Sequence, residues 1–266
     1  MKRVGPVSLG AAVRHGEICN VLASAGRVSI AELAERLGVT SVTIREDLKY
    51  LEEQGLLVRT RGGALAKPEQ RAETALELTS MTNRAEKQAI ASYAASLVES
   101  GQTVMIDVGS TTTFLAQTLS PDLIGVTVVT NGLNIALSLE NAPGVSVIVT
   151  GGTLRSLQHS LVAPMGTLLL KQMQADVAFI GCNGVDPKRG FTNANIAEAE
   201  IKQAMLDSAH YCVFLADHEK IGTVSSAFVA DIDKADLLVT DSGSDADVLE
   251  ALREDGLETK VVGPIS

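Results

Sequence analysis

Residues 103–113 read Thr-Val-Met-Ile-Asp-Val-Gly-Ser-Thr-Thr-Thr, a short apolar run followed by a glycine turn and a polar helix start. The first five residues predict a buried strand that ends at Asp107. Gly109 permits a tight turn, and the free amides and hydroxyls of Ser110, Thr111, Thr112 and Thr113 converge at the start of a helix. Such a site suits an anion, and phosphate best. An ordinary N-terminal cap in a threonine-rich helix explains the same residues, so both interpretations stay open.

The rest of the chain after residue 83 repeats this alternation of strand and helix. We expect strands at 103–107, 126–130, 145–149, 176–181, 211–216, 236–240 and 258–262. Helices are expected between them at about 111–119, 132–140, 164–173, 197–208 and 244–254. This order predicts an α/β domain with a mostly parallel sheet and helices on both faces. Apolar residues make up 45% of the chain and aromatic residues only 3%, which is typical of such a core.

Ligands of these sheets bind beyond the carboxyl ends of the strands. Asp107 stands at such an end, where it could accept sugar hydroxyls or cap its own turn. Small polar residues and one lysine follow the other expected strands, and the candidates for ligand binding are Thr130, Asn131, Gly151, Gly152, Asn183 and Lys220. Lys220 supplies a positive charge that suits a phosphate. Glu198 and Lys202 lie four residues apart on one expected helix, a spacing typical of a surface ion pair.

The first 60 residues follow a different pattern. Apolar residues at helical spacing predict a helix over 11–25, and a capping box of Ser29 and Glu32 begins a second one that ends at Gly38. Thr40 is a good N-cap for a third helix from Ser41 to about Gln54. Two short helices joined by a glycine-containing turn form a helix–turn–helix pattern.

The third helix is the expected DNA-reading element, because such helices enter the major groove by their N-terminal end. Hydroxyl and basic side chains suit phosphates and base edges, and the candidates on this helix are Ser41, Thr43, Arg45 and Lys49. The strand-like run 56–61 and the following Gly62-Gly63 predict a wing, on which Arg59 and Arg61 would reach the DNA backbone. A protein-interaction module could show the same pattern.

Charge and composition divide the chain into parts. Residues 1–67 hold ten Lys and Arg against seven Asp and Glu, whereas the remainder holds twelve against twenty-five. A basic head on an acidic body fits a local DNA footprint. Apolar periodicity is lost from Gly62 to about Thr82, and Asn83 with Glu86 predicts a capped helix that runs to about Glu99. We therefore expect a DNA-binding domain at 8–65, a linker at 66–82 and a sensing domain at 83–266.

Other function classes find little support in the sequence. The three cysteines and four histidines have no metal-ligand spacing, so we expect neither a metal nor a cofactor. No apolar run approaches the roughly 18–20 residues of a membrane span, and no secretory signal is evident. These features predict a cytoplasmic protein, associated with the nucleoid when it is bound to DNA.

Several of these motifs together resemble one known family. Arg14, Ile18 and Leu22, followed by Thr40-Ser41-Val42-Thr43-Ile44-Arg45-Glu46-Asp47-Leu48, look like the signature of the DeoR family of sugar-responsive repressors. The series continues through 107–112, 130–132, 151–154, 181–184, 198–200 and 217–220 in the family's order, so the resemblance runs from about residue 14 to the end. Glu46, Glu219, Ile221 and Ala163 depart from the family's usual residues.

The resemblance implies a winged helix–turn–helix joined to a sensor whose fold is similar to ribose-5-phosphate isomerases and CoA-transferases. It also implies a dimer or tetramer that binds double-stranded operator DNA, and a phosphorylated sugar held at Ser110–Thr113. It adds Glu198 to the ligand candidates and gives Asp47 a structural role. The resemblance implies that ligand binding relieves repression. The alternatives are an isomerase-like enzyme, with Asp107, Glu198, Lys202 or Lys220 as its acid–base groups, and a protein–protein adaptor.

Overall fold

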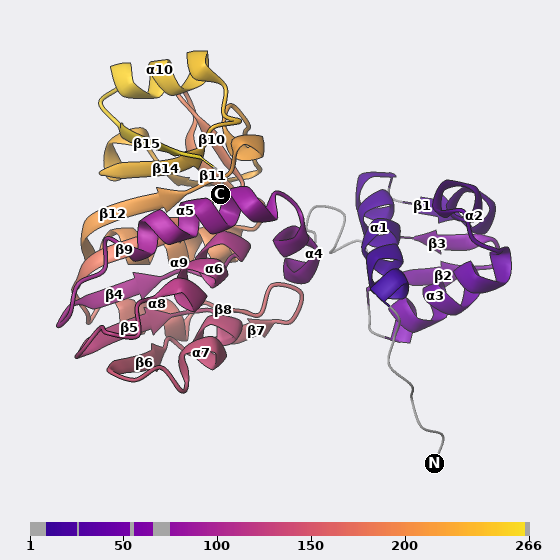
Figure 1. Cartoon of the computed structure of the whole chain (residues 1–266), viewed down its shortest axis with the longest axis horizontal. Coiled ribbons are helices and arrows are strands. Elements are labelled where there is room, and N and C mark those ends of the chain that lie inside the picture. The colour runs from indigo at the N-terminus through magenta and orange to yellow at the C-terminus, as the bar shows by residue number, and fades with distance from the viewer. Residues whose placement is uncertain (1–8, 26, 54–55, 66–74, 264–266) are drawn as a thin grey trace. The chain divides into compact units, whose positions relative to one another are not determined.

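The computed structural model describes residues 9–25, 27–53, 56–65 and 75–263. The chain forms two compact units, residues 1–78 and residues 79–266, and each is described by itself (Figure 1). Among the described residues, no helix has both the length and the apolar character to cross a bilayer.

The N-terminal unit is a winged helix–turn–helix, as predicted. Three helices, α1 (Leu9–Ala25), α2 (Ile30–Leu37) and α3 (Ser41–Glu53), accompany a small antiparallel sheet in the order β1-β3-β2. Its strands are β1 (Arg27–Ser29), β2 (Val58–Thr60) and β3 (Gly63–Leu65). The predicted capping box is confirmed, and the left-handed Gly38, with φ of 64°, ends α2. The wing is the β2–β3 hairpin, whereas β1 was not predicted.

An acidic side chain lies at the centre of this unit. Asp47 on α3 is 5% exposed and accepts two hydrogen bonds from Arg14 of α1, at 2.5 and 2.8 Å. His15 Nε2 lies 2.8 Å from Asp47 Oδ1, and the His15 ring stacks on Tyr50 with centroids 4.8 Å apart. Asp47 therefore joins α1 to α3 and has the structural role that the resemblance implied.

The second unit is built on a seven-stranded parallel sheet in the order β15-β14-β12-β9-β4-β5-β6. The strands are β4 (Thr103–Ile106), β5 (Val126–Thr130), β6 (Val145–Val149), β9 (Ala175–Gly181), β12 (Ala209–Leu215), β14 (Leu237–Asp241) and β15 (Glu258–Val262). All seven strands expected from the sequence are present, because each is a short apolar run bounded by polar or glycine-containing turns.

Helices cover both faces of this sheet. One core packs against α5 (Arg84–Ala95), α6 (Ser110–Thr118) and α7 (Leu133–Leu139). The other packs against α8 (Met165–Leu170), α9 (Ile196–Leu206) and α10 (Ala246–Glu254). Consecutive strand residues alternate between the two cores, so Ile106 faces the first and Met105 the second. Both faces are buried, which explains why the strands are almost continuously apolar.

The structure adds elements that the sequence did not predict. β7 (Thr153–Arg155) and β8 (Ser160–Val162) form a hairpin, and β10 (Gly184–Asp186), β11 (Gly190–Asn193) and β13 (Ala227–Ala230) form a small antiparallel sheet. Two short 3₁₀ turns, η2 (His218–Lys220) and η3 (Ile232–Lys234), follow β12 and β13. These strands have three or four residues, too few to show a period.

Two expectations around the predicted linker were wrong in detail. A short helix, α4 (Leu76–Met81), lies inside the segment expected to lack periodicity, while residues 66–74 of that segment lie outside the described residues. Asn83 does not cap α5 with its side chain, because its backbone is left-handed, with φ of 48°, and its amide makes no capping hydrogen bond. The helix also ends at Ala95 rather than near Glu99.

We predict that Asp47→Asn lowers the free energy of unfolding of the N-terminal unit by about 1.5–3 kcal/mol, because it weakens charge-assisted hydrogen bonds. Burial raises the pKa of Asp47, but the hydrogen bonds from Arg14 and His15 outweigh it and hold that pKa below its usual value. The stabilisation is therefore present above the ordinary aspartate pKa and is lost as pH falls through the lower folded value.

Urea denaturation of the full chain, followed by far-ultraviolet circular dichroism at several pH values, measures this effect. Glu46→Gln is the matched control, since Glu46 is the exposed neighbour on the same helix. An Asp47→Asn variant as stable as the control at neutral pH would contradict the role of Asp47.

Candidate ligand site at the carboxyl edge of the sheet

The order of the strands places a topological switch point between β4 and β9, and the region beyond the carboxyl ends of these two strands is called the crevice below. The chain builds β4, β5 and β6 outward in one direction and then β9, β12, β14 and β15 in the other. Ligands of open α/β sheets bind at such a switch point, beyond the strand ends. Asp107 directly follows β4, and Gly181 ends β9. The Gly181 amide donates to Asp107 Oδ2 at 3.2 Å, which joins the two sides of the crevice.

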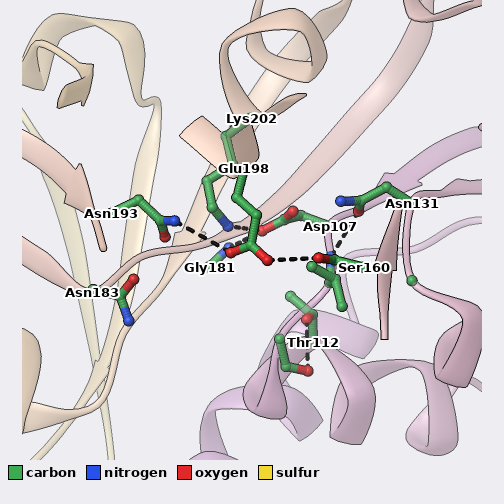
Figure 2. A network of polar contacts seen from close by, with 12 residues as sticks. Asp107, Thr112, Asn131, Ser160, Gly181, Asn183, Asn193, Glu198 and Lys202 are labelled. Carbon is green, nitrogen blue, oxygen red and sulfur yellow. Dashed lines mark hydrogen bonds and ion pairs between the residues drawn. The ribbon is translucent and has the colours of Figure 1, made fainter. Parts of the chain in front are cut away.

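Asp107 is fully buried and forms an ion pair with Lys202 of α9 (Figure 2). Its second oxygen, Oδ1, has no hydrogen-bond partner among the described residues. Burial raises the pKa of Asp107 to about 6, although the Lys202 ammonium opposes this rise and Glu198 adds to it. The buried Oδ1 is therefore an acceptor open to a donor such as a ligand hydroxyl.

Glu198 is the centre of a second group of contacts on α9. Its Oε1 pairs with Arg155 of β7 and accepts from Ser160 Oγ at 2.6 Å, and its Oε2 accepts from Asn193 Nδ2 at 3.3 Å (Figure 2). The predicted surface ion pair between Glu198 and Lys202 is therefore wrong. Both side chains are buried and bind other elements, because α9 lies between the sheet and smaller strands and buries most of its circumference.

The start of α6 has the geometry of an anion site. Thr112 Oγ1 and Thr113 Oγ1 both donate to the Gly109 carbonyl, at 3.1 and 2.5 Å. The hydroxyls of Ser110 and Thr111 have no such partner within the described part of the chain, and the first amides of a helix lack intrahelical acceptors. Two hydroxyls and several amides at one helix start are therefore available to an anion.

Two candidates at the end of β5 accept hydrogen bonds from backbone amides next to the crevice. Asn131 is fully buried, and its Oδ1 accepts from the Val108 amide at 2.9 Å. Thr130 Oγ1 accepts from the Gly132 amide at 3.0 Å. Both side chains thus position the backbone around the crevice.

Backbone conformation and close packing explain why glycine occupies both candidate positions after β6. Gly151 and Gly152 have positive φ angles of 72° and 125°. A Cβ atom on Gly152 would lie 2.1 Å from the Val162 carbonyl oxygen of β8. Glycine there allows the β7–β8 hairpin to approach, and this hairpin carries Arg155 to Glu198.

The remaining candidates come from the far side of the crevice. Asn183, after β9, accepts at 2.9 Å from the amide of Ala194, the residue that follows Asn193. Lys220 is half-buried in η2 and has no ion-pair partner within 4 Å among the described residues. Burial raises the pKa of the Cys182 thiol to about 12, and Lys202 and Lys220 are both near enough to oppose that rise. Lys220 therefore lies near the end of β9.

Sequence reasoning named Lys202 only as a surface ion-pair partner or as an acid–base group of the isomerase alternative, and it missed three side chains of this edge, Arg155, Ser160 and Asn193. Lys202 had a detectable signal, because it lies among Ala199, Ile201 and Met205 on a helix with few solvent-facing positions. Arg155, Ser160 and Asn193 lie in three- and four-residue strands and had no signal of their own. Within the described ranges, no group of His, Cys, Asp and Glu side chains is arranged to hold a metal ion.

The DNA-reading candidates lie on one unit and differ in their partners. Ser41, Arg45 and Lys49 are exposed on α3, while Thr43 Oγ1 lies 3.0 Å from Thr40 Oγ1 at the helix start. On the wing, Arg59 Nε donates to Glu52 of α3 at 2.8 Å. Arg61 is exposed in the β2–β3 turn.

Comparisons with known proteins agree with this architecture. Residues 14–70 match the DeoR-like helix-turn-helix domain, and residues 82–242 match the DeoR C terminal sensor domain. A putative aga operon transcriptional repressor of Escherichia coli O157:H7 is 34% identical over 96% of this chain and 95% of its own length. The glycerol-3-phosphate regulon repressor of Escherichia coli K12 is 29% identical over 93% of this chain and 98% of its own length.

Among solved structures, a ribose 5-phosphate isomerase from Methanocaldococcus jannaschii matches with a TM-score of 0.39 and 16% identity, over 52% of this chain and 55% of that one. The two domain matches fall on the two units of the fold, and the full-length relatives are transcription regulators. The resemblance drawn from the motifs is confirmed, and the chain belongs to the DeoR family of transcriptional regulators.

Proposed function

We propose that this regulator represses genes of sugar metabolism and that a phosphorylated sugar, bound at the β4–β9 crevice, changes its affinity for operator DNA. The main observation in support of this ligand is that hydrogen-bond donors at a helix start lie beside a buried acceptor. The helix start at Ser110 and Thr111 offers donors to a phosphate, and Asp107 Oδ1 offers an acceptor to a hydroxyl. A phosphate and a hydroxyl are the two groups that a sugar phosphate combines.

The relatives support the same class of ligand and gene. One is named for an operon and another for the regulon of glycerol 3-phosphate, a small phosphorylated polyol. Lys220, near the end of β9, supplies the positive charge for the phosphate. Thr112, Thr113, Thr130, Asn131, Gly151 and Gly152 then act by positioning the backbone, while Asn183 and Glu198 line the opposite side.

The DNA side of the proposal rests on α3 and the wing. Arg45 and Lys49 lie one helical turn apart and have no ion-pair partner among the described residues, so their charges are available to DNA. Ser41 and Thr43 lie at the N-terminal end that enters the groove. One reading helix covers few bases, so we propose a dimer or tetramer that occupies repeated half-sites in the cytoplasm, on the nucleoid.

We predict that Ser110→Ala and Thr111→Val each weaken sugar phosphate binding by about 1.5–3 kcal/mol, the contribution of a hydrogen bond to a charged group. Thr118→Val is the matched control, because this exposed threonine lies in the last turn of α6 and its hydroxyl donates to the Phe114 carbonyl. Isothermal titration calorimetry with a panel of sugar phosphates measures the loss. Equal affinities for all three variants and the unaltered chain would rule out the anion site.

We predict that Arg45→Ala weakens operator binding by about 1–3 kcal/mol and relaxes base preference, whereas Lys49→Ala lowers the salt dependence of binding by about one charge. Fluorescence anisotropy at several salt concentrations, with DNA from upstream of the protein's own gene, measures both. Arg253→Ala is the control, since that arginine is an exposed, Glu250-paired residue of the sensor unit. Full-strength binding by Arg45→Ala would show that α3 is not the reading helix.

A further inference from the structure

Lys87 on α5 is a buried cation that the proposed ligand site does not use. Its side chain is 3% exposed. The ammonium donates to the carbonyl oxygens of Thr79 and Thr82, both at 2.7 Å, and lies 3.2 Å from Asp217 Oδ2. An ammonium has three donors, so its hydrogen-bonding capacity is fully used by two elements that are far apart in the chain.

Two of these partners belong to the entry of the chain into the sensor unit. Thr79 lies in α4, and Thr82 lies in the turn between α4 and α5. The last carbonyls of a helix lack intrahelical partners, and a cation stabilises them. Lys87 therefore holds the C-terminal end of α4, in the segment that follows the DNA-binding unit along the chain.

The third partner belongs to the rim of the ligand crevice. Asp217 lies two residues after the end of β12, and its Oδ1 accepts from the Glu219 amide at 3.2 Å, so it fixes the turn η2 that carries Lys220. Burial lowers the pKa of Lys87, the Asp217 carboxylate opposes this change, and the nearby Lys220 ammonium adds to it. Lys87 therefore responds electrostatically to the state of Lys220.

A buried ion pair is weak evidence for a stabilising role, because apolar side chains of similar volume often stabilise a fold as well or better. The distinctive property of the Lys87–Asp217 pair is that it connects the α4–α5 corner to the η2 turn. An anion bound at Lys220 neutralises one charge next to Lys87 and attracts the η2 turn. Asp217 is the N-cap of that turn, so a shift of the turn on anion binding would change the distance from Asp217 to Lys87 and with it the hold on α4.

We propose that Lys87 is the positioning residue that couples occupancy of the η2 turn to the α4–α5 corner, and thereby couples effector binding to DNA binding. This inference rests on the proposed function, since it needs an effector that alters DNA affinity. Coupling of this kind is a ratio of DNA affinities with and without effector, and ratios of about 5 to 150 are common. Loss of coupling differs from loss of binding, because each ligand can still bind alone.

The test compares Lys87→Met with the unaltered full-length chain. Anisotropy gives the dissociation constant for upstream DNA, with and without a saturating sugar phosphate. The probe is whichever of ribose 5-phosphate, glucose 6-phosphate and glycerol 3-phosphate changes the unaltered chain's affinity most. We expect Lys87→Met to bind both DNA and the probe within about threefold of the unaltered chain, while the coupling ratio falls to within about twofold of one.

Two further variants keep the test decisive. Lys87→Met leaves the Asp217 carboxylate buried without a cation, so Lys87→Met/Asp217→Asn removes both charges and is measured if the single variant does not fold. Lys260→Met is the matched control, because Lys260 contacts the same helix through the Tyr93 ring, 5.0 Å away, and is exposed. It should keep the full ratio.

The outcomes separate the two proposals. An unchanged coupling ratio in a folded Lys87→Met or double variant overturns the role of Lys87 and leaves the proposed function intact. A coupling ratio of one for the unaltered chain with every probe overturns the proposed function, and the role of Lys87 with it. An equal loss of coupling in Lys260→Met would show a general sensitivity of α5, which also overturns a specific role for Lys87.

Discussion

The ion pair between Asp107 and Lys202 is the constraint on which the sensor's crevice depends. Asp107 lies at the end of β4, directly before the α6 helix start, whereas Lys202 comes from α9 on the opposite face of the sheet. The same carboxylate accepts from the end of β9. A single buried acid thus fixes both sides of the switch point and joins the two hydrophobic cores. The start of α6 has a defined position because the strand before it is held by α9 on the other face of the sheet.

This arrangement leaves Asp107 Oδ1 without a hydrogen-bond partner among the described residues. Buried polar atoms in folded proteins nearly always have a partner, and an exception at a strand end in a crevice points to a ligand or a water. Asp107 Oδ1 can accept from a hydroxyl, whereas an ionised ligand carboxylate placed there would meet like charge. If a sugar phosphate binds here as proposed, a phosphorylated polyol therefore fits Asp107 better than a phosphorylated acid does. Glu198 does not compete for the same donor, because its oxygens already accept hydrogen bonds from Ser160 and Asn193.

The sequence was sufficient to predict the main sheet and most of its helices, but insufficient to predict the short strands and the roles of charged residues. Seven strands and most helices were predicted because period, glycine and capping signals are local, as at Ser29 and Glu32. Glu198 and Lys202 were misread because a four-residue spacing indicates a surface pair only when the helix face is exposed, and exposure depends on packing by distant strands. Asn83 failed as a cap for a related reason, since its backbone takes a left-handed conformation that local propensity does not reveal. No sequence pattern indicated the ion pairs of Arg155 and Lys87, because their carboxylate partners lie 43 and 130 residues away.

Ion pairs within the N-terminal unit also explain how a chain of net charge −10 can present basic groups to DNA. Asp47 is turned inward and bound by Arg14 and His15, and Glu52 is bound by Arg59. Each acid is thereby neutralised by a basic group at hydrogen-bonding distance, where attraction is strongest. Arg45 and Lys49 on α3 and Arg61 on the wing have no such partner among the described residues, so their charges remain available. Charges at hydrogen-bonding distance interact with little screening, whereas charges separated by more than the Debye length of about 8 Å at physiological salt are largely screened.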